Sequence, residues 1–141
     1  MGKYRKGANA ERELIQTLWG LGLAVARVAG SGGCKLPAPD LVALGKGKRL
    51  AFECKAWDNN YLNISNEQMG ELDEWCGRAE AEYFIAWKVP REGWYFLSKE
   101  AFKKTPKGYN INRSTAKKKA INLGIIVGNQ SVLGGDKNDG N

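Results

Sequence analysis

The spacing of apolar residues divides the chain into helical and extended segments. Leu14, Ile15 and Leu18 recur at helical spacing and predict a helix over residues 7–21. Ser65 is a good N-cap for a second helix, which we expect to end near Arg78. Short apolar or alternating runs predict strands at residues 23–28, 41–44, 49–57, 82–89 and 93–97. This order predicts an α/β domain with a mixed central sheet.

The connections and the C-terminal part follow from their glycine, proline and polar content. Residues 29–39 are rich in glycine and proline and predict a loop, and residues 45–48 predict a hairpin turn. Further on, we expect one helical turn at 99–104 and a short strand at 108–111, while 116–127 fits either helix or strand. Residues 134–141 are polar and glycine-rich, so we expect a single domain over 1–133 and a disordered tail.

The hairpin predicted around residues 45–48 brings two acidic residues together. A four-residue turn pairs Leu44 with Arg49, and the same register places Asp40 opposite Glu53. Directly opposed residues have Cβ atoms about 4.5–5.5 Å apart on one face of the sheet. Lys55 lies on that face too, about 7 Å further along the strand. The other face is apolar and is expected to pack on the core; it carries Leu41, Ala43, Leu50, Phe52 and Cys54.

Opposed carboxylates repel each other, so this arrangement favours a bound cation. A divalent ion would remove the repulsion between Asp40 and Glu53, and Lys55 could stabilise charge on a phosphate. Glu11 lies on the apolar stripe of the first helix, where a carboxylate needs a partner. Taken singly, Asp40 could be a turn residue, and Glu53 and Lys55 a solvated strand face. A register slip of one residue would separate the two carboxylates.

Composition narrows the chemistry that these residues can perform. The chain of 141 residues contains no histidine, which excludes histidine acid–base chemistry and serine–histidine triads. Its three cysteines, Cys34, Cys54 and Cys76, are too few and too scattered for a zinc site and are read as reduced thiols. A metal would therefore be a hard cation such as Mg²⁺, held by oxygen atoms.

The net charge of +7 favours a polyanionic partner, although many small basic proteins bind nucleic acid only incidentally. No apolar run is long enough to cross a bilayer, and the first residues do not resemble a signal peptide. We therefore expect a soluble cytoplasmic protein associated with the nucleoid, with no membrane partner.

Further candidate contacts each have a structural alternative. The loop Gly30-Ser31-Gly32-Gly33 could approach a phosphate or merely connect two strands. Lone arginines are usually solvated, and an apolar helical stripe usually packs in a core. The lysines at 103, 104, 107 and 117–119 form either a solvated face or a phosphate-contacting surface, and we favour the second. No one of these features indicates phosphate binding by itself, and they support it only when taken together.

Three stretches of the sequence match patterns of known nucleases. Pro39-Asp40, twelve residues, then Glu53-Cys54-Lys55 matches the PD-x(n)-(D/E)xK signature of restriction-endonuclease-like nucleases. More specific are the stretches YRKGANAEREL at residues 4–14 and RVAGSG at residues 27–32. Together they resemble the archaeal Holliday junction resolvases over roughly residues 4 to 100. The resemblance implies a restriction-endonuclease-like fold with helices flanking the sheet.

The resemblance also implies an activity: a homodimer that binds a four-way DNA junction and nicks two opposed strands symmetrically, in recombination and repair. The hydrolysis would depend on Mg²⁺, for which Mn²⁺ should substitute. The catalytic residues implied are Glu11, Ser31, Asp40, Glu53 and Lys55, and the metal ligands are Glu11, Asp40, Glu53 and the backbone carbonyl of Cys54. DNA contacts are expected from Lys6, Arg12, Arg27 and Ser31, and dimer contacts from Met69, Leu72 and Trp75.

Two other functions remain open from the sequence. One is a basic protein of related fold that binds branched DNA without cutting it, although acidic residues would be unfavourable in a pure phosphate-binding site. The other is a nuclease of the same superfamily that acts on flaps or duplex ends. A comparison of junction, flap and duplex substrates in the presence of Mg²⁺ separates these possibilities.

Overall fold

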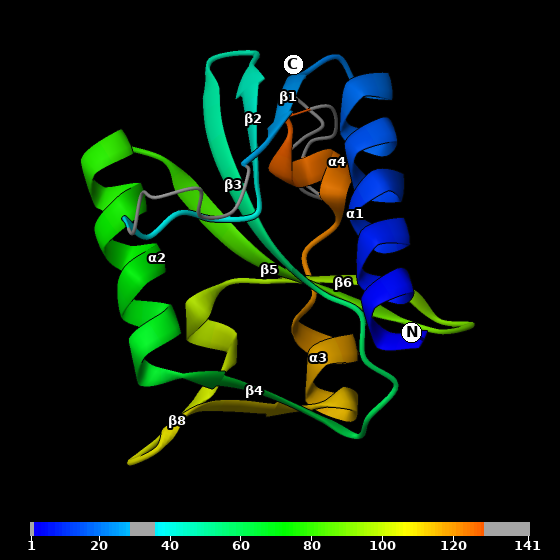
Figure 1. The fold of residues 1–141 in the computed structure, drawn as a ribbon, viewed down its shortest axis with the longest axis vertical. Helices are drawn as coiled ribbons and strands as arrows, with labels where there is room; N and C mark the ends of the chain where they lie inside the picture. Colours follow the sequence, from blue (N-terminus) through cyan, green and yellow to red (C-terminus); the bar gives the residue numbers. More distant parts are fainter. Residues whose placement is uncertain (1, 29–35, 129–141) are drawn as a thin grey trace, which may run out of the picture.

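A five-stranded mixed sheet forms the centre of the molecule (Figure 1). The structure, a computed structural model, describes residues 2–28 and 36–128. The strand order is β1-β2-β3-β5-β6, in which β3 and β5 are parallel and the other neighbours are antiparallel. The strands are β1 (Ala24–Arg27), β2 (Leu41–Gly45), β3 (Lys48–Lys55), β5 (Glu82–Val89) and β6 (Gly93–Leu97). The predicted mixed α/β architecture is confirmed.

Helix α1 (Gly2–Gly20) covers one face of this sheet, because its apolar stripe meets the apolar face of the β2–β3 hairpin. Leu14 and Leu18 are fully buried there against Leu41 and Phe52, and Val127, after the short helix α4 (Leu123–Ile126), completes the cluster. Burying such side chains stabilises the fold by roughly 1.5–3 kcal/mol each. Among the described helices, none has the length and apolar character needed to cross a lipid bilayer.

A second apolar cluster lies between the sheet, helix α2 (Asn66–Ala79) and a smaller antiparallel sheet. The smaller sheet has the order β4-β8-β7 and consists of β4 (Tyr61–Ser65), β8 (Gly108–Asn112) and β7 (Lys103–Thr105). Leu62 and Ile64 of β4 point inward, and Trp87 of β5 is fully buried among them. The 3₁₀ turn η1 (Lys99–Ala101) and helix α3 (Arg113–Lys119) flank this sheet.

The elements differ from the predicted ones mainly where no long apolar pattern exists. Helix α1 begins five residues before the expected start, because its first turns are polar and basic. Strands β4 and β7 were not predicted: β4 has only two inward apolar residues, and β7 has none. The ambiguous segment 116–127 divides into the end of α3 and helix α4. The expected tail at 134–141 lies outside the described residues.

Candidate active site

The β2–β3 hairpin has the predicted register and brings Asp40 and Glu53 together. Leu44 pairs with Arg49 as expected. Asp40 lies immediately before β2, and its Oδ2 accepts a hydrogen bond of 2.9 Å from the Cys54 backbone N–H. The Asp40 backbone in turn hydrogen-bonds to the Glu53 carboxylate. These two exchanged contacts fix both carboxylates at the same end of the hairpin.

Gln68, in the first turn of α2, connects Glu53 to Lys55. Its Nε2 donates a hydrogen bond of 2.8 Å to Glu53 Oε2, and its Oε1 accepts one of 3.3 Å from Lys55 Nζ. The amide can bridge the carboxylate and the ammonium group because it is both a donor and an acceptor. Lys55 Nζ also lies 5.7 Å from the centre of the Trp57 ring, a cation–π distance. The predicted convergence of Asp40, Glu53 and Lys55 is therefore present.

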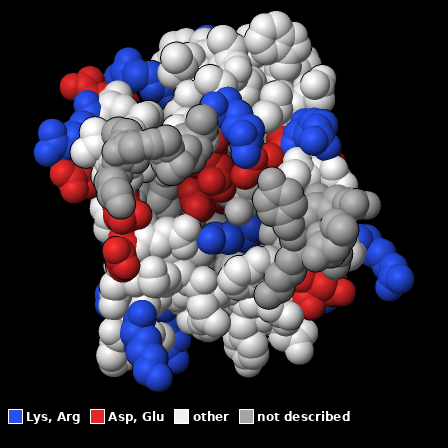
Figure 2. All heavy atoms as spheres, viewed as in Figure 1, with Lys and Arg blue, Asp and Glu red and all other residues white. Residues whose placement is uncertain are grey.

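The electrostatics of this site favour an added positive charge. Only 8% of Glu53 is exposed, and burial, together with the charge of Asp40, raises the pKa of Glu53 to about 7. Burial also raises the pKa of Asp40, with a smaller contribution from the charge of Glu11. Two neighbouring carboxylates whose pKa values are both raised lack sufficient counter-charge. Figure 2 shows acidic atoms gathered near the centre of this face, with basic atoms on either side.

Glu11 lies close to this pair but faces a different partner. Its Oε1 forms an ion pair of 2.9 Å with Arg27 Nε, and its side chain is 20% exposed. It is near enough for its charge to raise the pKa of Asp40. Among the described residues, no three acidic or cysteine side chains are grouped closely enough to form a metal site as they stand. The predicted three-carboxylate cluster is thus found as a pair with Glu11 beside it.

The remaining predicted site residues have varied positions. Arg12 Nη1 donates a 2.8 Å hydrogen bond to Asn9 Oδ1 on the exposed side of α1. Lys6 belongs to α1, while its side chain is not described. Ser31 lies outside the described residues. Burial raises the pKa of the Cys54 thiol, so this side chain is neutral and leaves only its backbone oxygen as a hard donor.

Gln68 was missed by the sequence analysis, although a signal for its position existed. Ser65 caps α2 as predicted, with its hydroxyl accepting a hydrogen bond from the Gln68 backbone N–H. A glutamine three residues after an N-cap serine usually returns its side chain to the N-cap. Here the side chain reaches Glu53 instead. Only the packing of α2 beside the end of β3 redirects it.

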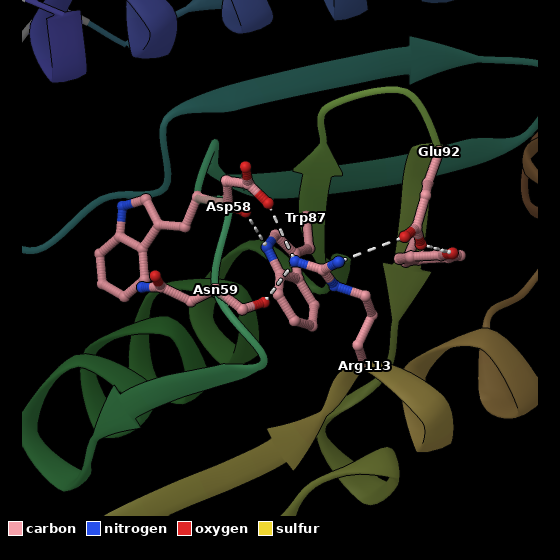
Figure 3. A network of polar contacts seen from close by, with 7 residues as sticks. Asp58, Asn59, Trp87, Glu92 and Arg113 are labelled. Carbon is pink, nitrogen blue, oxygen red and sulfur yellow. Dashed lines mark hydrogen bonds and ion pairs between the residues drawn. The ribbon is translucent and has the colours of Figure 1, made fainter.

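The segment that follows Lys55 is held by a partly buried arginine (Figure 3). Arg113, at the start of α3, pairs with Asp58 at 3.1 Å and Glu92 at 3.3 Å, and donates a 2.8 Å hydrogen bond to the Asn59 carbonyl. Trp87 Nε1 donates a further hydrogen bond to the backbone of the same segment. The connection between β3 and β4 is therefore fixed on several sides, close to Lys55.

The apolar stripe of α2 packs mainly inside the chain itself. Met69 and Leu72 are 0% and 2% exposed in the second core cluster, so the predicted dimer contact does not hold for these two. Trp75 is partly exposed and lines a groove of about 460 Å³ together with Leu36 and Arg78. For Trp75 the interface stays a prediction.

Comparison with known proteins identifies the family. The model of the archaeal Holliday junction resolvases (Hjc) matches residues 2–132. The chain is 37% identical over 110 residues to the crossover junction endodeoxyribonuclease Hjc of Archaeoglobus fulgidus, covering 77% of this chain and 80% of that one. Its namesake from Methanocaldococcus jannaschii is 44% identical over 70 residues, about half of each chain.

The fold agrees with this match. The solved structure of Archaeoglobus fulgidus Hjc, a Holliday junction resolvase, superimposes with a TM-score of 0.80 at 30% identity. The alignment covers 90% of this chain and 99% of that one, and supports the expected restriction-endonuclease-like fold. On both sequence and structure, this chain belongs to the archaeal Holliday junction resolvase family.

Proposed function

We propose that this protein, as an endonuclease that resolves Holliday junctions, cuts DNA at the site formed by Asp40, Glu53 and Lys55. The observation that carries the proposal is the buried carboxylate pair joined to an ammonium group through Gln68. Hydrolysis of a phosphodiester needs a cation to hold the phosphate and a group to stabilise the developing charge. The carboxylate pair that would bind the cation and the ammonium group that would stabilise the charge both lie at the end of the β2–β3 hairpin.

The donor set suits Mg²⁺, with Mn²⁺ as a substitute. Mg²⁺ is usually bound by one or two carboxylates, with waters and substrate phosphate completing its octahedron. Asp40 and Glu53 supply two carboxylates whose pKa values are raised by burial. A bound cation would lower the free-energy cost of keeping both groups charged. Glu11 and the Cys54 carbonyl are the remaining candidate ligands, and Glu11 would have to exchange its ion pair with Arg27 for the metal.

Each protein group has a separate task in the reaction. Bound Mg²⁺ would supply polarisation of the scissile phosphate and activation of a water molecule. Lys55 would stabilise negative charge on a phosphate oxygen, because its ammonium group lies on the same face as the carboxylates. Gln68 would hold Lys55 and Glu53 at a fixed separation. Outside this centre, Lys6, Arg12, Arg27 and Ser31 are the proposed phosphate contacts.

A homodimer would match the symmetry of the substrate. Resolution needs two cuts related by two-fold symmetry, and an isologous dimer presents two identical sites in that relation. The groove lined by Trp75 and Leu36 is the proposed contact, because Leu36 is 79% exposed and partly exposed aromatic residues favour interfaces. Arg78 and Glu74 at its edge would provide a polar rim.

Cleavage of a labelled four-way junction, a flap and a plain duplex during a Mg²⁺ titration tests the proposal. We expect paired nicks in the junction only. Glu53→Gln and Lys55→Met should each slow cutting by roughly 100-fold or more while junction binding in EDTA changes little. The matched control is Glu71→Gln, which removes an exposed carboxylate of α2 away from the proposed interface, and this variant should cut at the wild-type rate. Wild-type cutting by Glu53→Gln would show that the site is misassigned.

A further inference from the structure

The positive charge of this protein is concentrated in one part of the chain. Residues 99–128 contain eight basic side chains and a single acidic one, so their net charge of +7 equals that of the whole chain. These residues form η1, β7, β8 and α3, which belong to the smaller sheet or flank it, and the uncharged helix α4, which packs in the first core cluster. Residues 1–98, which include the sheet that carries the carboxylate site, contain 13 basic and 12 acidic residues and so have a net charge of only +1. This asymmetry needs an explanation beyond solubility.

Lys99 of η1 forms an ion pair with Asp73, and the other lysines of this region separate into two groups at opposite ends of β8. Lys103, Lys104 and Lys107 belong to the β7–β8 hairpin, whereas the lysines at 117–119 lie on α3. The five residues of β8 put about 14 Å between the groups. Lys104 lies over the Tyr109 ring at 5.2 Å and bonds its own hairpin. Lys103 and Lys107 are exposed, and within the described ranges neither forms an ion pair.

The β7–β8 turn, residues 105–108, is rigid enough to place Lys107. Thr105 Oγ1 donates to the Gly108 carbonyl at 3.1 Å and accepts from the Gly108 N–H at 3.2 Å. Pro106 restricts the backbone between them. Gly108 has φ +155, and a Cβ there would meet the Ile64 oxygen at 2.5 Å, so β8 packs closely against β4.

The same turn is tied to the helix that carries Gln68. Asn66 Nδ2 donates a 3.0 Å hydrogen bond to the Pro106 carbonyl, and Gly108 pairs with Ser65 in the sheet. Ser65 and Gln68 are three residues apart, about 4.5 Å along the axis of α2. Figure 2 shows basic atoms at the lower left of the face that carries the central acidic group, where Figure 1 places the end of the β8 hairpin.

We propose that the β7–β8 hairpin contacts the DNA backbone through Lys103 on β7 and Lys107 in the turn, a few nucleotides from the phosphate held at the carboxylate site. The inference rests on the proposed function and adds the surface that fixes where the duplex arm leaves the site. Because α2 joins the turn to Gln68, the contact would set the register of the strand relative to the cut. Phosphate contacts of this kind position DNA without reading its sequence.

Backbone neutralisation tests the proposal without relying on cleavage. A series of junctions carries one methylphosphonate linkage at successive positions from the cut, and binding is measured in EDTA. Wild-type protein should lose affinity at one or two positions near the cut. At those positions, and only there, the methylphosphonate linkage should leave the affinity of the Lys103→Gln/Lys107→Gln variant unchanged. For this variant, the slope of log affinity against log salt should be shallower by about two for each bound protomer, because roughly 0.9 counterion is released per phosphate contact and each protomer loses two lysines.

Lys118→Gln/Lys119→Gln is the matched control, because it removes the same charge from the other end of β8. It should weaken binding equally at all positions of the series. The proposal would be overturned if the Lys103→Gln/Lys107→Gln variant still lost affinity at every methylphosphonate position that weakens the wild type. It would also be overturned if Lys118→Gln/Lys119→Gln became insensitive at the positions near the cut. Cleavage of the unmodified junction by the wild-type protein in Mg²⁺ tests the proposed function separately. Failure of the proposed function can therefore be distinguished from failure of the proposed lysine contacts.

Discussion

At the scale of single residues, Glu53 shows most clearly how the fold prepares the site. Its carboxylate is buried beside Asp40, yet it is hydrogen-bonded by Gln68 and by the Asp40 backbone. The hydrogen bonds favour the charged form, whereas burial and the neighbouring carboxylate oppose it more strongly. The residue therefore stores an unfavourable charge that a cation can relieve. The same conflict is the basis of a pH dependence.

Metal-free protein should lose stability as pH rises. The folded pKa of Glu53, about 7, exceeds its ordinary value of 4.5, so the folded state binds more protons between these values. The resulting stability is complete below pH 4.5 and is lost as pH rises through 7. Urea unfolding in EDTA should show a decrease of about 2–3 kcal/mol from pH 5 to pH 8.

Glu53→Gln should remove most of this decrease, whereas Glu71→Gln, at an exposed position of α2, should keep it. Mg²⁺ at pH 8 should restore stability to the wild type by binding the folded state only. Equal stability of the metal-free wild type at both pH values would contradict this account.

At the scale of elements, the connection between β3 and β4 matters because it follows Lys55 directly. Arg113 joins this connection to α3 and to Glu92 in the β5–β6 turn (Figure 3). Its side chain is 26% exposed, less than that of most paired cations on this surface. Such partly buried, multiply bonded cations contribute more to stability than exposed ion pairs. The network thus anchors the end of the strand that carries the active site.

Arg113→Met should lower the free energy of unfolding by about 2 kcal/mol, since several charge-assisted hydrogen bonds are lost together. The control is Arg78→Met, which breaks an exposed pair with Glu74 within α2 and should cost less than about 0.5 kcal/mol. Urea titrations of both variants measure the difference. Equal losses in the two proteins would show that the Arg113 network adds little.

At the scale of the whole molecule, the proposed dimer depends on a partly exposed tryptophan. Trp75 faces the groove beside Leu36, whereas Met69 and Leu72 on the same helix are used in the core. A helix can serve both purposes because its buried stripe and its flank face different directions. The contact would place two carboxylate sites in a two-fold relation.

Trp75→Lys should convert a dimer to monomer without unfolding the chain, because the residue lies outside the fully buried core. Sedimentation velocity over a range of concentrations measures the change. Trp19→Lys is the control: Trp19 is 64% exposed on α1 and its replacement should leave the dimer intact. A wild-type protein that stays monomeric at all concentrations, or a dimeric Trp75→Lys, would exclude this interface.

The sequence alone determined the parts of this protein that depend on local pattern. A four-residue turn between two strands, with one apolar face, permits a single register, and that register places Asp40, Glu53 and Lys55 together. The main helices and the five central strands follow from apolar spacing for the same reason. What these features share is that neighbouring residues along the chain decide them.

Tertiary structure alone decided the contacts between distant segments. The bridge from Gln68 to Glu53, the pairing of Glu11 with Arg27 and the burial of Met69 depend on which faces pack together. The separation of the lysines into two groups depends on the path of β8, a short strand whose pairing partners lie far away in sequence. Long-range packing selects among side-chain directions that local pattern leaves equally favourable, and for this reason the sequence could not predict them.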